Sequence, residues 1–287
     1  MQYSNKMTKN IPKSVMNKFD LTGKNIVVSG GAGFLGEHFV DAILEANGNP
    51  IILDNDKERL IELEKKYKNT STMFFLVDIL NYNQLVKISR KIISKKSKID
   101  VLINATAFAM KNLLKGGKEF FNPIENYSRD LWEIAINVNL TGTFLVTQMF
   151  GKSMIENKSG VIINIASDVG IISPDPRIYE PNELYDYKGV SFNTPISYSV
   201  SKAGIISFTR HLATHWAKYG IRVNALSPAG VYNNHEDKFV EQLTSRIPLA
   251  RMADPEELKG PIIFLASDAS SFMTGTNLVV DGGRTIW

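Results

Sequence analysis

The sequence predicts a single doubly wound α/β domain, and three observations carry this prediction. Short β-branched runs alternate with longer amphipathic segments along the chain, which is typical of βαβ units around a parallel sheet. Runs such as VIINIA, from Val161, are almost entirely apolar, as strands covered on both faces must be. No linker rich in Pro, Gly or Ser divides the 287 residues. We therefore expect one domain over residues 19–287.

The elements follow in chain order from the periodicity. The expected strands are Asn25–Ser29, Pro50–Asp54, Thr72–Asp78, Ile99–Asn104, Val161–Ala166, Ile221–Leu226 and Asn277–Asp281. After the first strand, Phe39, Val40, Ile43 and Leu44 recur at helical spacing. Apolar helices are also expected over Asp130–Phe150 and Tyr198–Trp216. The result is a parallel sheet of about seven strands with helices on both faces.

The composition excludes several classes of protein. The net charge of +4 is modest and the basic residues are dispersed, whereas a nucleic-acid binder usually carries a dense basic stripe. No apolar run reaches the roughly 20 residues that a membrane span needs, and the polar start lacks the apolar centre of a secretory signal. The absence of cysteine excludes disulfides. We expect a cytoplasmic protein with no nucleic-acid or membrane partner, preceded by a mobile basic tail over residues 1–18.

A glycine-rich turn follows the first strand, in SGGAGFLG. Gly30, Gly33 and Gly36 would let the backbone approach a pyrophosphate, which then rests on the N-terminus of the next helix. Asp54 ends the second strand and can accept hydrogen bonds from both ribose hydroxyls of NAD. The same carboxylate would repel the 2′-phosphate of NADP, so NAD is favoured. Lys57 and Arg59 lie close enough in sequence to keep NADP as the less favoured alternative.

Tyr198 and Lys202 lie in SYSVSKAG, at the start of a predicted helix. Residues four apart share one helix face, so the phenol and the ammonium are expected to be neighbours. An ammonium near the phenol would lower the pKa of the tyrosine, and so would a positively charged nicotinamide. A tyrosine activated in this way can act as an acid or a base.

Taken together, these motifs resemble the compact branch of the short-chain dehydrogenase/reductase family over nearly all of Phe19–Trp287. The motifs that carry the resemblance are SGGAGFLG, VDIL with Asp78, INATA from Ile103, NVNLTGTF with Asn139, INIAS ending in Ser167, YSVSK, NALSPAGV and FLASDASSFMTGTNLVVDGG. The resemblance implies a Rossmann-type fold and reversible hydride transfer between a nicotinamide and an alcohol or carbonyl. It departs from the usual pattern at Ser29, Thr106, Ala229 and Asn233.

The resemblance also implies a role for individual residues. Tyr198 would be the general acid/base, Lys202 its activator, Ser167 the group that binds the substrate oxygen, and Asn139 the holder of a proton-relay water. The implied cofactor-binding residues are Gly30, Gly33, Phe34, Leu35, Gly36, Asp54, Asp78, Ile79, Asn104, Ala105, Tyr198, Lys202, Pro228, Gly230, Val231 and Asn233. No metal site is expected, and His211 and His215 are interpreted as surface or interface residues.

A long segment between Ser167 and Tyr198, over about residues 170–195, is expected to be the substrate loop. Its aromatic and charged side chains suit a hydroxyl-rich small molecule, and Arg177 and Lys188 could bind a phosphate or carboxylate. The chain is similar to family members assigned to flagellin or surface-polysaccharide sugar modification. We therefore hypothesise an NAD-dependent oxidoreductase acting on a sugar or sugar phosphate.

Two alternatives stay open at this point. One is an enzyme like 3-oxoacyl-[acyl-carrier-protein] reductase, which the compact pattern favours. The other is a non-catalytic nucleotide-sensing or structural protein on the same fold. By resemblance, the helices Asp130–Phe150 and Tyr198–Trp216 would pack in a homodimer or homotetramer.

Overall fold

Seven parallel strands form one sheet through the centre of the molecule, in the order β3-β2-β1-β4-β5-β6-β7. The computed structural model describes residues 14–108, 122–179 and 194–287. The strands are β1 (Asn25–Ser29), β2 (Asn49–Asp54), β3 (Met73–Leu76), β4 (Val101–Asn104), β5 (Gly160–Ile165), β6 (Ile221–Pro228) and β7 (Asn277–Val280). The order reverses between β1 and β4, which confirms the doubly wound prediction.

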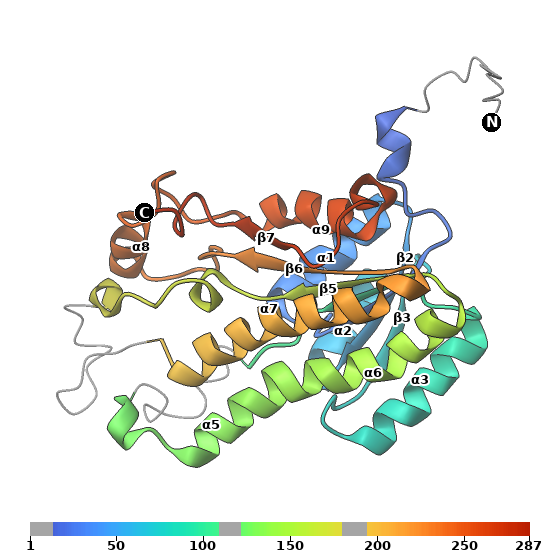
Figure 1. The fold of residues 1–287 in the computed structure, drawn as a ribbon, viewed down its shortest axis with the longest axis horizontal. Helices are drawn as coiled ribbons and strands as arrows, with labels where there is room; N and C mark the ends of the chain where they lie inside the picture. Colours follow the sequence, from blue (N-terminus) through green and yellow to red (C-terminus); the bar gives the residue numbers. More distant parts are fainter. Residues whose placement is uncertain (1–13, 109–121, 180–193) are drawn as a thin grey trace, which may run out of the picture.

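Helices cover both faces of this sheet. They are α1 (Phe34–Glu45), α2 (Lys57–Lys66), α3 (Tyr82–Lys96), α5 (Arg129–Ile136), α6 (Gly142–Glu156), α7 (Ile196–Trp216), α8 (Asp237–Thr244) and α9 (Lys259–Ala266). Figure 1 shows α1 and α9 above the strands and α3 and α6 below them. Successive strand residues alternate between the two cores: Ile26 and Val28 face α1, α2 and α9, whereas Val27 faces α3, α6 and α7.

The expected helix over Asp130–Phe150 is interrupted. After α5, residues Asn137–Thr141 form one turn of π-helix before α6 begins. Single π-turns inside helices are frequent at functional sites, and Asn139 lies within this one. The helix expected from Tyr198 begins two residues earlier, at Ile196.

The expected tail and loop are described only in part. Residues 1–13 of the tail lie outside the described residues, and Val15–Lys18 form a short 3-10 helix, η1. Much of the long substrate segment, including Lys188, also lies outside them. Along the portions that the structure describes, no helix has the length and apolar character to cross a bilayer.

Because all seven strands are parallel, their carboxyl ends meet at one edge of the sheet. The residues that end β1, β2, β4 and β6 there are Ser29, Asp54, Asn104 and Pro228. Crevices at this edge, where the strand order reverses, are the usual ligand sites of such sheets. The sequence-predicted site residues are therefore concentrated along one edge.

Candidate active site

The glycine-rich turn is closely packed between β1, β4 and α1. Gly30 has φ +72°, a conformation that only glycine adopts readily. A Cβ on Gly30 would lie 2.6 Å from the backbone nitrogen of Thr106, and a Cβ on Gly36 would collide with the carbonyl oxygen of Gly30. Gly33 precedes α1 and provides no side-chain cap. Because no side chain occupies this helix N-terminus, Phe34 and Leu35 can present backbone N–H groups to a phosphate.

Asp54 braces this turn from the end of β2. Its carboxylate accepts hydrogen bonds from the backbone N–H of Ala32 (3.0 Å) and from that of Asp56 (3.0 Å). Burial raises the pKa of Asp54. Asp56, not Asp54, is the N-cap of α2, since its side chain accepts from the N–H of Arg59. The Asp54 carboxylate thus stands beside the turn with lone pairs left for ribose hydroxyls.

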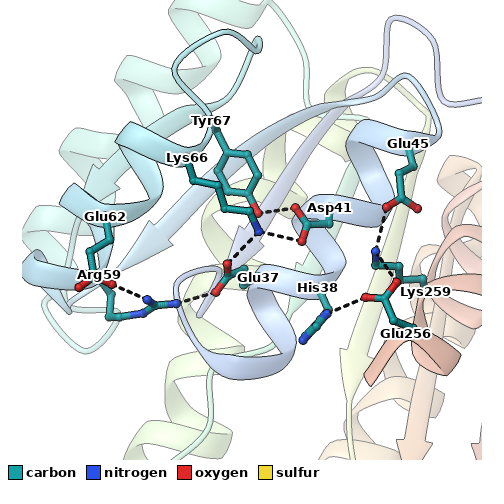
Figure 2. A network of polar contacts seen from close by, with 10 residues as sticks. All are labelled: Glu37, His38, Asp41, Glu45, Arg59, Glu62, Lys66, Tyr67, Glu256 and Lys259. Carbon is teal, nitrogen blue, oxygen red and sulfur yellow. Dashed lines mark hydrogen bonds and ion pairs between the residues drawn. The ribbon is translucent and has the colours of Figure 1, made fainter. Parts of the chain in front are cut away.

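Among the basic residues near Asp54 in the sequence, Arg59 and Lys66 are paired with carboxylates, whereas Lys57 is exposed at the start of α2. Figure 2 shows Arg59 bound to Glu37 of α1 and Glu62 of α2. Lys66 bridges Glu37 and Asp41 at 2.9 Å each, and the hydroxyl of Tyr67 donates to Asp41 at 2.6 Å. The charge of Arg59 therefore joins α1 to α2 instead of offering a partner for a 2′-phosphate. This pairing favours NAD over NADP.

Asp78 and Ile79 follow β3, next to the end of β2. The backbone N–H of Val77 donates to the carbonyl of Asp54 at 2.8 Å, which places the two carboxylates on the same edge. Asp78 is exposed, and one of its oxygens accepts from the N–H of Leu80 at 2.9 Å. Ile79 is buried against Gly142, where a Cβ would meet its side chain. Asp78 is thus accessible to an adenine, as the resemblance implies.

Asn104 turns its side chain into the sheet instead of toward the turn. Its amide donates to Thr147 (2.9 Å) and Asn164 (2.8 Å), and Asn164 in turn donates to Thr209 at 2.9 Å. This buried chain of hydrogen bonds ties β4 and β5 to α6 and α7. Only the backbone after Asn104, from Ala105, follows the turn, since the N–H of Ala105 donates to the carbonyl of Ser29.

Two departures from the family pattern meet in space. The hydroxyl of Thr106 donates to that of Ser29 at 3.2 Å. Ser29 stands where the family usually has Thr, and Thr106 where it usually has Gly. Both departures thus take part in one hydrogen bond, which links the start of the glycine-rich turn to the segment after β4.

The segment after β6 is shaped by close packing around Gly230. A Cβ on Gly230 would lie 2.6 Å from the side chain of Leu243 in α8, and its carbonyl accepts from the N–H of Ala253 at 3.0 Å. Val231 forms a parallel bridge with Ala253. The N–H of Asn233 donates to His235 at 3.1 Å. The segment from Pro228 to Asn233 therefore continues from the carboxyl end of β6 and is held by α8 and by the chain around Ala253.

The four expected catalytic residues come from β5, the π-turn and α7. Lys202, 3% exposed, donates from Nζ to the carbonyl of Ile165 at 2.7 Å and lies 5.6 Å from the ring centroid of Tyr198. Tyr198 is hydrogen-bonded to the side chain of Ser167. The Asn139 amide donates to Ser201 of α7 at 3.0 Å. Asn139 is thus anchored beside the helix that carries Tyr198 and Lys202.

The electrostatics differ from the expectation. Burial and the nearby carboxylate of Asp168 raise the pKa of Tyr198 to about 12, although the hydrogen bond to Ser167 opposes this rise. Burial lowers the pKa of Lys202 to about 8. The expectation that Lys202 lowers the pKa of Tyr198 is therefore not met in this structure, because burial disfavours the phenolate and the charge of Asp168 adds to that effect.

Sequence reasoning missed Asp168 and Arg284. The hydroxyl of Ser167 donates to Asp168 at 2.8 Å, and the backbone N–H of Val169 donates to the same oxygen at 2.8 Å. The other carboxylate oxygen binds the guanidinium of Arg284, from the segment after β7. The sequence does show a carboxylate directly after Ser167 and an arginine directly after Asp-Gly-Gly. However, no pattern around Asp168 or around Arg284 predicts that the two side chains form an ion pair.

The described part of the long segment packs against α8. Ile178 and Tyr179, in the 3-10 helix η6 (Pro176–Tyr179), are buried with Leu243, Ile247 and Met252. The ring of Tyr179 stacks on Phe239 of α8, with centroids 5.7 Å apart. This small apolar cluster forms one wall beside Tyr198 at the edge of the sheet.

Charged groups on the same segment are already paired. Asp175 binds Arg177 through both carboxylate oxygens, at 2.8 and 2.9 Å, and also binds Arg246 at 2.6 Å. One carboxylate is thus shared by two guanidiniums, so the three groups keep a net positive charge, and the expectation that Arg177 binds a phosphate or carboxylate stays a prediction. The other residue in that expectation, Lys188, lies outside the described residues.

His211 and His215 stack on each other on α7, with ring centroids 4.5 Å apart. Among the residues that the structure describes, no group of three or more His, Asp or Glu side chains is arranged to hold a metal ion.

Curated relatives cover almost the whole chain. An NAD-dependent glycerol dehydrogenase of Listeria innocua serovar 6a is 31% identical, covering 93% of this chain and 96% of its own. The 3-oxoacyl-[acyl-carrier-protein] reductase FabG of Thermotoga maritima is 32% identical (93% and 99%). A ribulose-forming D-arabinitol 2-dehydrogenase of Candida tropicalis is 34% identical (96% and 96%).

Structures and family models agree with these relatives. A short chain dehydrogenase from Leptospira borgpetersenii serovar Hardjo-bovis, solved with bound NAD+, superposes with a TM-score of 0.81 at 31% identity, covering 97% of this chain and 98% of its own. The model described as short chain dehydrogenase matches residues 24–177, and the one described as enoyl-(acyl carrier protein) reductase matches residues 185–285. The chain therefore belongs to the short-chain dehydrogenase/reductase family.

Proposed function

We propose that this protein is an NAD-dependent oxidoreductase that interconverts a hydroxyl and a carbonyl on a hydroxyl-rich small molecule, such as a polyol, sugar or sugar phosphate. The observation that carries the proposal is the cluster of Tyr198, Ser167 and Lys202 at the same sheet edge as the glycine-rich turn. The glycerol and D-arabinitol dehydrogenases among the relatives support a polyol or sugar substrate.

The residues present fit the cofactor. The turn is tight because a Cβ on Gly30 or Gly36 would collide with neighbouring backbone atoms. The carboxylate of Asp54 lies beside this turn. Bound NAD supplies the acceptor, or in reverse the donor, of a hydride. Gly30 to Gly36 would hold its pyrophosphate, Asp54 a ribose, and Asp78 the adenine. The segment Pro228–Asn233 would lie along the nicotinamide.

The chain's own residues manage the proton on the substrate oxygen. Tyr198 takes that proton when an alcohol is oxidised and returns it when a carbonyl is reduced. Ser167 holds the substrate oxygen, since its hydroxyl lies within hydrogen-bonding reach of Tyr198. Asn139 would hold a water in a proton relay, as the family resemblance implies. Lys202 would bind the nicotinamide ribose, because its buried ammonium lies beneath the tyrosine ring.

The test is a substrate screen with purified protein. Polyols, sugars, sugar phosphates and a 3-oxoacyl thioester are each assayed with NAD(H) and NADP(H) by the absorbance of the reduced nicotinamide. We expect turnover of polyols or sugars, with NAD preferred. Activity confined to the acyl thioester would overturn the proposal in favour of the reductase alternative, which the FabG relative supports.

Three finer predictions accompany this proposal. A place in flagellin or surface-glycan sugar biosynthesis, a cytoplasmic location and a homodimeric or homotetrameric state all follow from the sequence. The oligomer prediction fits the exposed side chains of Ile134, Phe144 and Val200 on α5, α6 and α7. Light scattering that shows a monomer at micromolar concentration would contradict the oligomer.

A further inference from the structure

A buried ion pair lies directly behind Ser167 and Tyr198. Asp168 is 3% exposed and Arg284 is 7% exposed, and the guanidinium of Arg284 binds a carboxylate oxygen of Asp168. The second oxygen accepts the hydroxyl hydrogen of Ser167 at 2.8 Å. Both charges are thus withdrawn from water and depend on each other.

The turn that carries Arg284 is held firmly. The Asp281 carboxylate accepts from the backbone N–H of Gly283 (2.8 Å) and from that of Thr285 (2.7 Å). Farther on, the indole N–H of Trp287 donates to the carbonyl of Arg246 at 3.1 Å. The segment that carries Arg284 is therefore held on both sides of this residue.

The direction of the Ser167 hydrogen bond has a chemical consequence. A serine hydroxyl has one hydrogen and two acceptor lone pairs. In this structure that hydrogen is given to Asp168, which fixes the orientation of Ser167 beside Tyr198. The hydroxyl hydrogen of a substrate alcohol then remains for Tyr198, the group that exchanges the proton.

We propose that Asp168 and Arg284 are positioning residues: Arg284 holds the Asp168 carboxylate in place and neutralises it, and Asp168 holds the Ser167 hydroxyl in a fixed orientation beside Tyr198. This inference rests on the proposed roles of Ser167 and Tyr198. It assigns a role in the reaction to the segment after β7, the last strand in the sheet order.

The charged and titratable groups around Tyr198 determine the expected pH behaviour. Asp168 faces it from the end of β5, Tyr179 from η6 and Lys202 from its own helix; Arg284 lies behind Asp168. Without Arg284, the carboxylate charge is unopposed and disfavours the phenolate. Without the Asp168 charge, the Arg284 cation is unopposed and favours it.

The test compares three variants: Arg284→Met, Asp168→Asn and the double variant. The pH dependence of kcat is measured at saturating NAD and substrate. In oxidation with NAD, the acidic limb of the profile reports the loss of the Tyr198 proton. Arg284→Met should move this limb to higher pH, and Asp168→Asn, which keeps an acceptor for Ser167, should move it to lower pH, each by about one pH unit or more. The double variant should return close to the wild-type profile. A merely structural pair would lower kcat without moving the limb in opposite directions, and that result would overturn the inference.

Two further variants keep the test decisive. Arg284→Lys preserves the charge and should keep the limb at its wild-type position even if kcat falls. Should Arg284→Met not fold, the shift expected in Asp168→Asn decides the test. Arg251→Met removes an exposed arginine paired with Glu257 and should leave the profile unchanged. An unmoved limb in Asp168→Asn and a limb displaced by Arg284→Lys would together contradict the inference.

Tyr198→Phe separates this inference from the proposed function. If wild type shows no NAD-dependent turnover, or if Tyr198→Phe retains it, the proposed function fails. If Tyr198→Phe loses turnover and the charge variants leave the limb where it was, only the role of Asp168 and Arg284 fails.

Discussion

Two parts of the proposed site differ in what determines their structure. At the carboxyl ends of β1 and β2, which we term the cofactor end, close backbone packing determines the shape of the site. At the carboxyl ends of β5 and β6, which we term the substrate end, hydrogen bonds between side chains determine it. The cofactor end depends on Gly30 and Gly36, where no Cβ fits. The substrate end depends on Ser167, Asp168 and Arg284, which are joined by side-chain hydrogen bonds.

The difference means that the two ends of the site tolerate substitutions to different degrees. Steric limits on glycine act within a short stretch of chain, so the cofactor end tolerates few alternatives. Side-chain pairs at the substrate end can be exchanged, provided that each buried charge keeps its partner. Cofactor binding and substrate choice can therefore change separately.

The largest expected effect lies at the substrate end. Tyr198→Phe removes the group that exchanges the proton, and kcat should fall about a thousandfold, within the usual range for a general acid/base. The dissociation constant for NAD, measured by calorimetry, should change little, because the phenol lies on the substrate side. Loss of NAD binding together with kcat would show that the two ends are not separable.

The next effect tests the cofactor end. Gly36→Ala places a Cβ against the carbonyl of Gly30, so we expect a loss of stability of about 1–3 kcal/mol from overpacking and a large loss of NAD affinity. Gly260→Ala, in α9, is the matched control, since its Cβ would meet no atom within 4 Å. It should be neutral or stabilising. Equal thermal shifts in both variants would contradict a steric role for Gly36.

Asp54→Ala should weaken NAD binding about tenfold or more, because it removes a charged hydrogen-bond acceptor, and should raise the relative affinity for NADP. The ratio of the two dissociation constants is the measurement. Asp56→Ala removes the N-cap of α2 and should cost about 1 kcal/mol of stability without changing that ratio. A ratio that shifts in Asp56→Ala but not in Asp54→Ala would refute the assignment.

The smallest effect concerns the polar network of Figure 2. Lys66→Met removes a partly exposed ion-pair partner of Glu37 and Asp41, and such pairs contribute at most about 1 kcal/mol. Urea unfolding at low and high salt should show a loss that shrinks with salt. A loss of NAD affinity in this variant would mean that the network supports the cofactor end more directly than its contacts indicate.

The sequence predicted the sheet well because each strand is a contiguous apolar run. The seven expected strands correspond to β1–β7, with ends shifted by a few residues. The glycine turn, Asp54 and Tyr198 with Lys202 were predictable for a similar reason, since each pattern is complete within a short segment.

Other features could not be predicted because they depend on long-range contacts. The pairing of Thr106 with Ser29 and of Asp168 with Arg284 requires the folded chain. The raised pKa of Tyr198 has the same origin, because it reflects burial and a carboxylate that the local pattern does not weigh. The π-turn at Asn139 could not be predicted either, because its apolar residues continue the spacing of an ordinary α-helix.

The separation of Asp168 from Arg284 by 116 residues also has a consequence for synthesis of the chain. A ribosome releases the N-terminal part first, so β1 to β5 can emerge before Arg284 has been made. During that interval the Asp168 carboxylate lacks its counter-charge, and burying it alone is unfavourable. The glycine-rich turn and the strands around it can therefore assemble early. The pair of Asp168 and Arg284 forms only after β7 has joined the sheet beside β6.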